Sequence, residues 1–214
     1  FNTVHRAQGW ADTPLTAPGI EVAQQLGRGV KDVNFLATYS SDLGRARETA
    51  RIVLEAKGAP AAITEMRQLR EVCFGNFEGD LDPNMWNPAA RHLGYASDTA
   101  LMADFAKGNI GIEKMVDAIA AVDPSGQAES YQQVKSRMQA ALTQIAKQAQ
   151  AQGGGNVLVV SHGMAITTML NEMTDTPITR PLGNASVSRI RYTDSGQFIV
   201  ESIDDMSYVE KGKS

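Results

Sequence analysis

The chain has 214 residues, of which 43% are apolar and 21% charged, and its formal net charge is −4. This balance is typical of a globular protein with a sizeable core, and the length favours one domain carrying an insertion over two full domains. Acidic and basic residues are interspersed, which disfavours partners such as nucleic acid or an anionic membrane. No apolar run approaches the roughly 20 residues of a membrane-spanning helix.

The single cysteine, Cys73, excludes an internal disulfide and a zinc site built from cysteines. It fits a reducing compartment, and we expect a cytoplasmic protein. Because the sequence starts at Phe1 without a methionine, removal of a signal peptide stays open. The sequence makes no prediction of oligomeric state.

In the first 66 residues, apolar spacing predicts helices that alternate with strands. Helices are predicted over 19–30 and 42–58, and strands over 34–41 and 60–66. Gly58 is expected to end the second helix as a C-cap. Helices alternating with single strands indicate a parallel α/β sheet.

Residues 80–128 interrupt this alternation, and we predict a helical insertion that covers one end of the sheet. Its first part, 80–95, is rich in turn residues, and two amphipathic stretches follow over 99–107 and 111–121.

The C-terminal part returns to the alternation. A long helix is predicted over 130–152, a strand over 156–163 and a helix over 164–173, followed by a hairpin with strands at 186–193 and 197–204. The prediction for the whole chain is therefore one α/β domain. It has three layers (α/β/α), a mostly parallel central sheet and a C-terminal hairpin.

Polar residues follow two predicted strands, and open parallel sheets bind ligands beyond the carboxyl ends of their strands. One strand runs into Ser40 and Arg45, the other into His162 and Gly163. At each helix start, free backbone N–H groups favour an anion, and an arginine fork matches phosphate or carboxylate. His162 suits an acid, a base, a nucleophile or a hydrogen-bond donor. Taken singly, a solvated Arg45 and a structural His162 are equally ordinary interpretations.

A third candidate is the segment 69–79, in which Glu71 and Glu78 lie among apolar residues and glycines. Such a segment can hold a partly desolvated carboxyl group of raised pKa, although an exposed loop with surface acids is the simpler interpretation of this stretch alone.

Four motifs occur in order along the chain: S-S-D-L-x-R-A-x-x-T-A (40–50), L-R-E-x-x-F-G-x-F-E-G (69–79), E-S followed by Arg137, and V-V-S-H-G (159–163). This set resembles the histidine phosphatase superfamily, in its phosphoglycerate-mutase-like branch. The opening N-x-x-x-R-x-Q-G-W-x-D-x-P-L-T-x-x-G (2–19) is similar to the segment after that family's first motif. The resemblance is nearly end to end, and 80–128 is the variable part.

The resemblance implies phosphoryl transfer to a nucleophilic histidine without a metal or another cofactor. His162 then holds the transferring phosphoryl group, and Glu71 protonates the leaving alkoxide and later activates water. The binding residues that it implies are Arg45, Asn2 and Gly163 for phosphate, and Gln8 and Gly9 for substrate.

The family's nucleophile belongs to an R-H-G-x-T motif, which we expect upstream of Phe1. His5 lies in V-H-R with no glycine after it and is expected to be a loop histidine, and His92 a surface or packing residue of the insertion. A pseudo-enzyme that lacks the motif is the alternative. We favour the presence of the motif on a strand upstream of Phe1. That strand would lie in the middle of the sheet, and without it the neighbouring strands would be left unpaired.

The expected function is hydrolysis of a small phosphorylated metabolite, which releases inorganic phosphate. A cofactor-dependent phosphoglycerate mutase and a non-catalytic phospho-ligand binding protein are the alternatives. In mutases of this type the acid motif is similar to E-R-H-Y-G, and further basic residues are needed to hold the carboxylate of a sugar acid. Here Phe74 replaces the tyrosine, and Glu78 and Asp80 follow, which favours hydrolysis.

Overall fold

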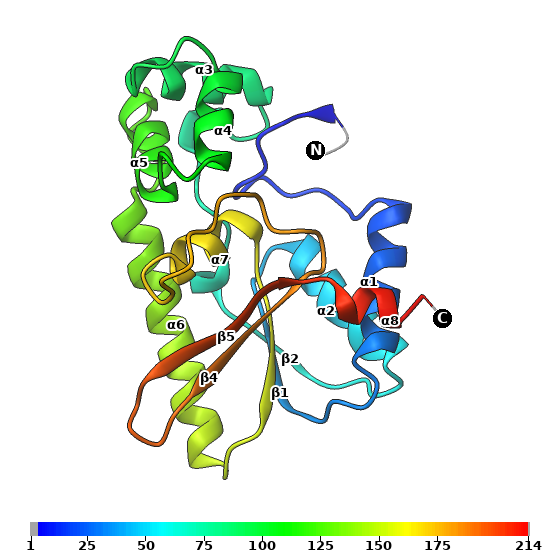
Figure 1. Ribbon diagram of the computed structural model, residues 1–214. Helices are drawn as coiled ribbons and strands as arrows, with labels where there is room; N and C mark the ends of the chain where they lie inside the picture. The colour runs from blue at the N-terminus through cyan, green and yellow to red at the C-terminus, as the bar shows by residue number, and fades with distance from the viewer. Residues whose placement is uncertain (1–3, 214) are drawn as a thin grey trace.

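A parallel sheet of three strands is the centre of the fold in the computed structural model, which describes residues 4–213 (Figure 1). The strand order is β2-β1-β3, and both pairs are parallel. The strands are β1 (Phe35–Ser40), β2 (Ile63–Glu65) and β3 (Asn156–Val160). The predicted parallel α/β sheet is therefore confirmed.

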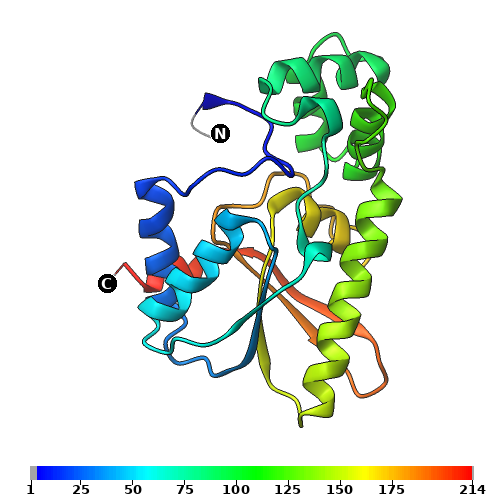
Figure 2. The same ribbon diagram turned by 180° about the vertical axis from the view of Figure 1, so that it is seen from behind.

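Helices cover both faces of this sheet, because successive side chains of a strand point to opposite faces. Val157 and Val159 pack with the helices α6 and α7, whereas Leu158 packs with α1 and α2. Figure 2 shows the sheet between these two helical layers. The predicted three-layer arrangement is confirmed. The helices are α1 (Ala17–Gly29), α2 (Gly44–Ala56), α6 (Tyr131–Ala151) and α7 (Gly163–Leu170).

The predicted C-terminal hairpin is also present, as β4 (Val187–Tyr192) paired antiparallel with β5 (Phe198–Asp205). Within residues 4–213 these two strands form a sheet of their own, and β3 pairs with β1 alone. A short helix, α8 (Ser207–Lys211), follows and buries Val209 in the cluster of α1 and α2. Sequence patterning missed α8 because five residues are too short to show a helical repeat.

Three helices form the segment predicted as an insertion: α3 (Asp82–His92), α4 (Asp98–Ala106) and α5 (Ile112–Val122). The two predicted amphipathic helices are confirmed, and the turn-rich stretch 80–95, for which no separate helix was predicted, forms α3. Pro83 lies in the first turn of α3, where a missing N–H costs nothing, and Pro88 is tolerated inside it. Met85 and Ala89 are buried, which offsets the lost hydrogen bond of Pro88.

The helices α3–α5 stand above the edge of the sheet at which β3 runs into α7 (Figure 1). Between β2 and α3, two 3-10 turns, η2 (Arg67–Leu69) and η3 (Gly75–Phe77), carry the segment around Glu71 past this edge. Among the described residues, no helix is long and apolar enough to cross a membrane.

Candidate functional site

The corner between β3 and α7 presents His162, as the sequence predicts. His162 has an extended backbone and occupies the N-cap position of α7. Its side chain is buried, and its Nε2 atom has no hydrogen-bond partner within the described part of the chain. A Cβ atom added to Gly163 would meet nothing within 4 Å, so the backbone is open to close approach at the helix start. A buried polar atom without a partner costs free energy unless a ligand satisfies it.

Glu71 lies at the same corner, although the segment that carries it is far from His162 in the sequence. It is 7% exposed, and its carboxylate accepts hydrogen bonds from the backbone N–H groups of Met164 (3.1 Å) and Ala165 (2.7 Å), in the first turn of α7. It also accepts from the N–H of Val72 at 2.9 Å. The fold therefore brings Glu71 next to the helix that His162 begins.

Burial raises the pKa of Glu71 above the ordinary value for a glutamate, although the three N–H donors and the charge of Arg45 act in the opposite direction. The expectation of a desolvated acid in 69–79 is met by this residue. Burial lowers the pKa of His162 well below the usual histidine value, and the positive charges of Arg45 and Arg137 lower it further. At neutral pH the imidazole is therefore neutral and can donate from one ring nitrogen.

This lowered pKa predicts an acid-sensitive contribution of His162 to stability. Below about pH 6.5 the unfolded chain binds a proton at this residue while the folded protein does not, so stability falls by roughly 1 kcal/mol per pH unit as the pH is lowered. His162→Gln removes that loss, and urea unfolding should show a decrease smaller by about 1 kcal/mol between roughly pH 7.5 and 5.5. His92→Gln, at an exposed position, is the control for removal of a histidine. An unchanged pH dependence in His162→Gln would contradict the prediction.

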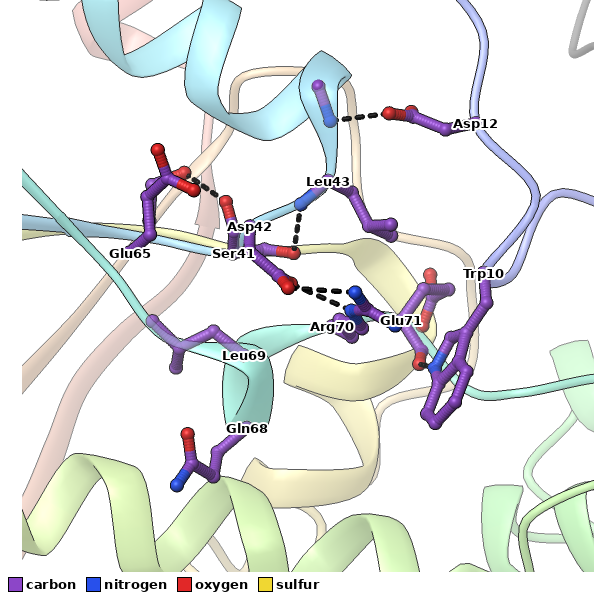
Figure 3. A network of polar contacts seen from close by, with 12 residues as sticks. Trp10, Asp12, Ser41, Asp42, Leu43, Glu65, Gln68, Leu69, Arg70 and Glu71 are labelled. Carbon is purple, nitrogen blue, oxygen red and sulfur yellow. Dashed lines mark hydrogen bonds and ion pairs between the residues drawn. The ribbon is translucent and has the colours of Figure 1, made fainter.

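Arg45 lies in the first turn of α2, and its environment differs from the expectation. The carboxylate of Asp12 accepts hydrogen bonds from the backbone N–H groups of Gly44 and Arg45, so it takes the place predicted for a bound anion. Figure 3 shows Asp12 directed toward the start of α2 beside Leu43. The guanidinium of Arg45 pairs with Asp12 at 3.1 Å and donates to the carbonyls of Gly9 (2.7 Å) and Ala11 (2.9 Å). The expectation of free N–H groups at the start of α2 is wrong, because residues 9–12 fold back and supply an internal anion.

Glu78 holds the opening loop, a role that the sequence analysis missed. Its carboxylate accepts hydrogen bonds from four backbone N–H groups, which belong to Gly9, Trp10, Ala11 and Phe74. A carboxylate with so many donors acts as an anchor. In the sequence, only the acidic residue of F-E-G hinted at a role for Glu78. Nothing in that motif indicated that its partners would be Gly9, Trp10 and Ala11, which are far away in the sequence.

The two predicted substrate residues lie within this loop. The Gln8 side chain donates to Thr13 at 2.7 Å, and a Cβ at Gly9 would lie 2.2 Å from the carbonyl oxygen of Val72. Packing alone therefore requires glycine at position 9, and the substrate contacts of Gln8 and Gly9 stay predictions. Asn2 lies outside the described residues. His5 is exposed in the opening loop, as expected.

Trp10 connects the opening loop to the acid segment. Its indole Nε1 donates to the carbonyl of Glu71 at 2.9 Å, and Figure 3 shows Trp10, Arg70 and Glu71 close together. The guanidinium groups of Arg67 and Arg70 lie 5.1 and 5.0 Å from the centroid of the Trp10 ring. Arg70 also forms two hydrogen bonds of 2.7 Å with the carboxylate of Asp42. The segment after β1, the opening loop and the acid segment thus form one polar network.

The sequence of this chain matches a family model over residues 1–99 and 112–205, and that model is the histidine phosphatase superfamily (branch 1). The chain belongs to this superfamily. The resemblance drawn from the four motifs is thereby confirmed, and the gap in the match at 100–111 lies inside the segment predicted to be variable.

Two similar proteins carry mutase names. A probable phosphoglycerate mutase GpmB from Klebsiella pneumoniae (strain 342) is 31% identical over 221 residues, which are 98% of this chain and 90% of the relative. The crystal structure of a phosphoglycerate mutase from Bacillus anthracis str. Sterne is 44% identical, has a TM-score of 0.92 and is matched over 100% of this chain and 91% of that one.

A solved structure of a phosphatase shares the fold. The structure of mycobacterial glucosyl-3-phosphoglycerate phosphatase Rv2419c in complex with VO3 has a TM-score of 0.69 and is matched over 95% of this chain and 92% of that one. At a sequence identity of 23%, this comparison shows a similar fold and nothing further.

Proposed function

We propose that the protein is a metal-independent phosphomonoester hydrolase that acts through a phosphohistidine on a small phosphorylated metabolite. The observation that carries this proposal is the pair at the β3–α7 corner. There a buried imidazole, whose Nε2 has no hydrogen-bond partner among residues 4–213, lies beside a buried carboxyl group of raised pKa. We also place the protein in the cytoplasm.

The proposed nucleophile is a histidine upstream of Phe1, on a strand between β3 and the hairpin. Two features support this placement. The described part of the chain shows no pairing between β3 and β4 or β5. The apolar run Val157–Val160 is also only partly buried, although such a run is typical of a strand in the middle of a parallel sheet.

In the proposed reaction the upstream histidine attacks phosphorus, and the bond to the ester oxygen breaks. Glu71 gives its proton to the leaving alkoxide, and His162 and Arg45 donate hydrogen bonds to the phosphoryl oxygens. Water then attacks the phosphohistidine, Glu71 takes back a proton, and inorganic phosphate leaves. Before it can hold phosphate, Arg45 must exchange its bonds to the opening loop for bonds to the ligand.

A phosphoglycerate mutase is the second candidate, because the relatives with 31% and 44% identity carry that name. A mutase also has to hold the carboxylate of a sugar acid. Two arginines near Glu71 already have internal partners, Arg70 with Asp42 and Arg137 with Glu129, and this supports the hydrolase.

The test uses the protein that carries the residues encoded before Phe1. We expect release of phosphate from p-nitrophenyl phosphate that resists EDTA, and acid-labile phosphohistidine in quenched samples. A mutase would instead interconvert 2- and 3-phosphoglycerate and respond to the bisphosphate cofactor. Absence of turnover on a broad phosphoester panel, with phosphate still bound, would favour the non-catalytic binder and overturn the hydrolase proposal.

A further inference from the structure

Arg137, from the third sequence motif, reaches from α6 to the segment that carries Glu71. Its side chain is 16% exposed, and all five of its N–H donors have acceptors in the protein. Three hydrogen bonds go to main-chain carbonyls, those of Gln68 (2.8 Å), Arg70 (2.6 Å) and Glu71 (2.7 Å). The other two go to the carboxylate of Glu129, each at 2.7 Å.

These hydrogen bonds fix the main chain both before and after Glu71. The carbonyls of Arg70 and Glu71 belong to the two peptide groups on either side of the Glu71 Cα atom. Glu129 extends the attachment, because its carboxylate accepts from the N–H of Cys73 at 2.9 Å and its own N–H donates to the carbonyl of Cys73 at 2.9 Å. The main chain around Glu71 is therefore fixed to α6 and to the residue before its N-cap.

We propose that the Arg137–Glu129 pair is a positioning unit that sets the direction of the Glu71 carboxyl group toward the ester oxygen of the substrate. This inference rests on the proposed function, since it assumes that Glu71 donates the proton to the leaving group. The five hydrogen bonds of Arg137 go to main-chain carbonyls and to Glu129 and none goes to the Glu71 carboxylate, so Arg137 acts by fixing the main chain. Proton transfer requires hydrogen-bond geometry between acid and acceptor, and a small displacement of the acid is costly.

The test compares two substrates in Arg137→Gln, again in the protein with its upstream residues. An alkyl phosphate needs a proton on its leaving oxygen, whereas p-nitrophenolate leaves without one. The comparison uses kcat/KM, which reports the first phosphoryl transfer and excludes the later hydrolysis of the phosphohistidine that both substrates share. We expect kcat/KM for the alkyl phosphate to fall about 10- to 100-fold and kcat/KM for p-nitrophenyl phosphate to change less than about threefold. Inhibition by inorganic phosphate should stay the same.

Two further variants make the result decisive. Lys135→Gln removes one cation from the same helix, where it pairs with Glu172, and should leave both rates unchanged. Glu129→Gln keeps the shape of the side chain and replaces Arg137→Gln if that variant does not fold; it should show the same selective loss. Equal losses of kcat/KM on both substrates, or a lowered Tm with unchanged rates, would overturn the positioning role. Wild-type protein without turnover on either substrate would overturn the proposed function itself, and with it this inference.

Discussion

Glu71→Gln is expected to lower kcat/KM for alkyl phosphomonoesters, which reports the first phosphoryl transfer, by about 10²- to 10⁴-fold, the usual contribution of a general acid. The amide has the size of the carboxyl group and can still accept from Ala165, but it has no proton to give to an alkoxide. For p-nitrophenyl phosphate the loss should be smaller, because the first step then needs no acid. The limb of the pH profile that reports this acid should disappear in the variant. Steady-state kinetics on both substrate types across pH measure these effects.

The control for this prediction is Glu65→Gln, which removes a carboxylate that is exposed and pairs with Arg47. It should leave both rates unchanged. Equal losses of kcat/KM in Glu71→Gln on alkyl and aryl phosphates would mean that Glu71 supports the structure of the site and is not the acid for the leaving group.

The second large effect is expected for Arg45→Ala. Hydrogen bonds to charged groups contribute about 1.5–3 kcal/mol, so the inhibition constants of phosphate and vanadate should rise about 10- to 150-fold. Arg45→Lys keeps the charge but loses the forked pair of N–H donors, so its inhibition constants should lie between those of Arg45→Ala and the wild type. Competition assays with both anions measure the change.

Arg47→Ala is the matched control, since it removes an exposed arginine two residues along the same helix. Its effect on inhibition should be negligible. Because Arg45 also holds the opening loop, unfolding in urea has to accompany the assay. Near-unchanged inhibition in a folded Arg45→Ala protein would remove Arg45 from the phosphate site.

The sequence was a good guide to the sheet and the helices that cover it, because apolar spacing reports which face of an element is buried. It failed for α3, where two prolines suggested turns and the burial of Met85 and Ala89 prevailed. Hydrophobic periodicity could not show that Asp12 caps α2, since that contact joins residues 32 apart.

For the site, single residues were uninformative, and only the ordered motifs together pointed to the superfamily. Nothing in the local pattern around Glu71 reveals that its carboxylate meets the start of a helix 93 residues later. The resemblance to the superfamily supplied that link, and the structure adds the hydrogen bonds that make it. Arg137 and Glu78 likewise form hydrogen bonds with main-chain groups, and such bonds cannot be recognised from the amino-acid sequence.

The hold of Asp12 on Arg45 also has a consequence for affinity. A ligand that takes the guanidinium must displace an internal carboxylate and two carbonyls, so its measured dissociation constant equals the intrinsic value divided by the fraction of molecules in which Arg45 is released. Asp12 thus acts as a competitor tethered within the chain. A singly charged anion offers Arg45 little more than Asp12 already does, whereas a phosphoryl dianion offers a second charge. The opening loop would therefore discriminate against small monoanions.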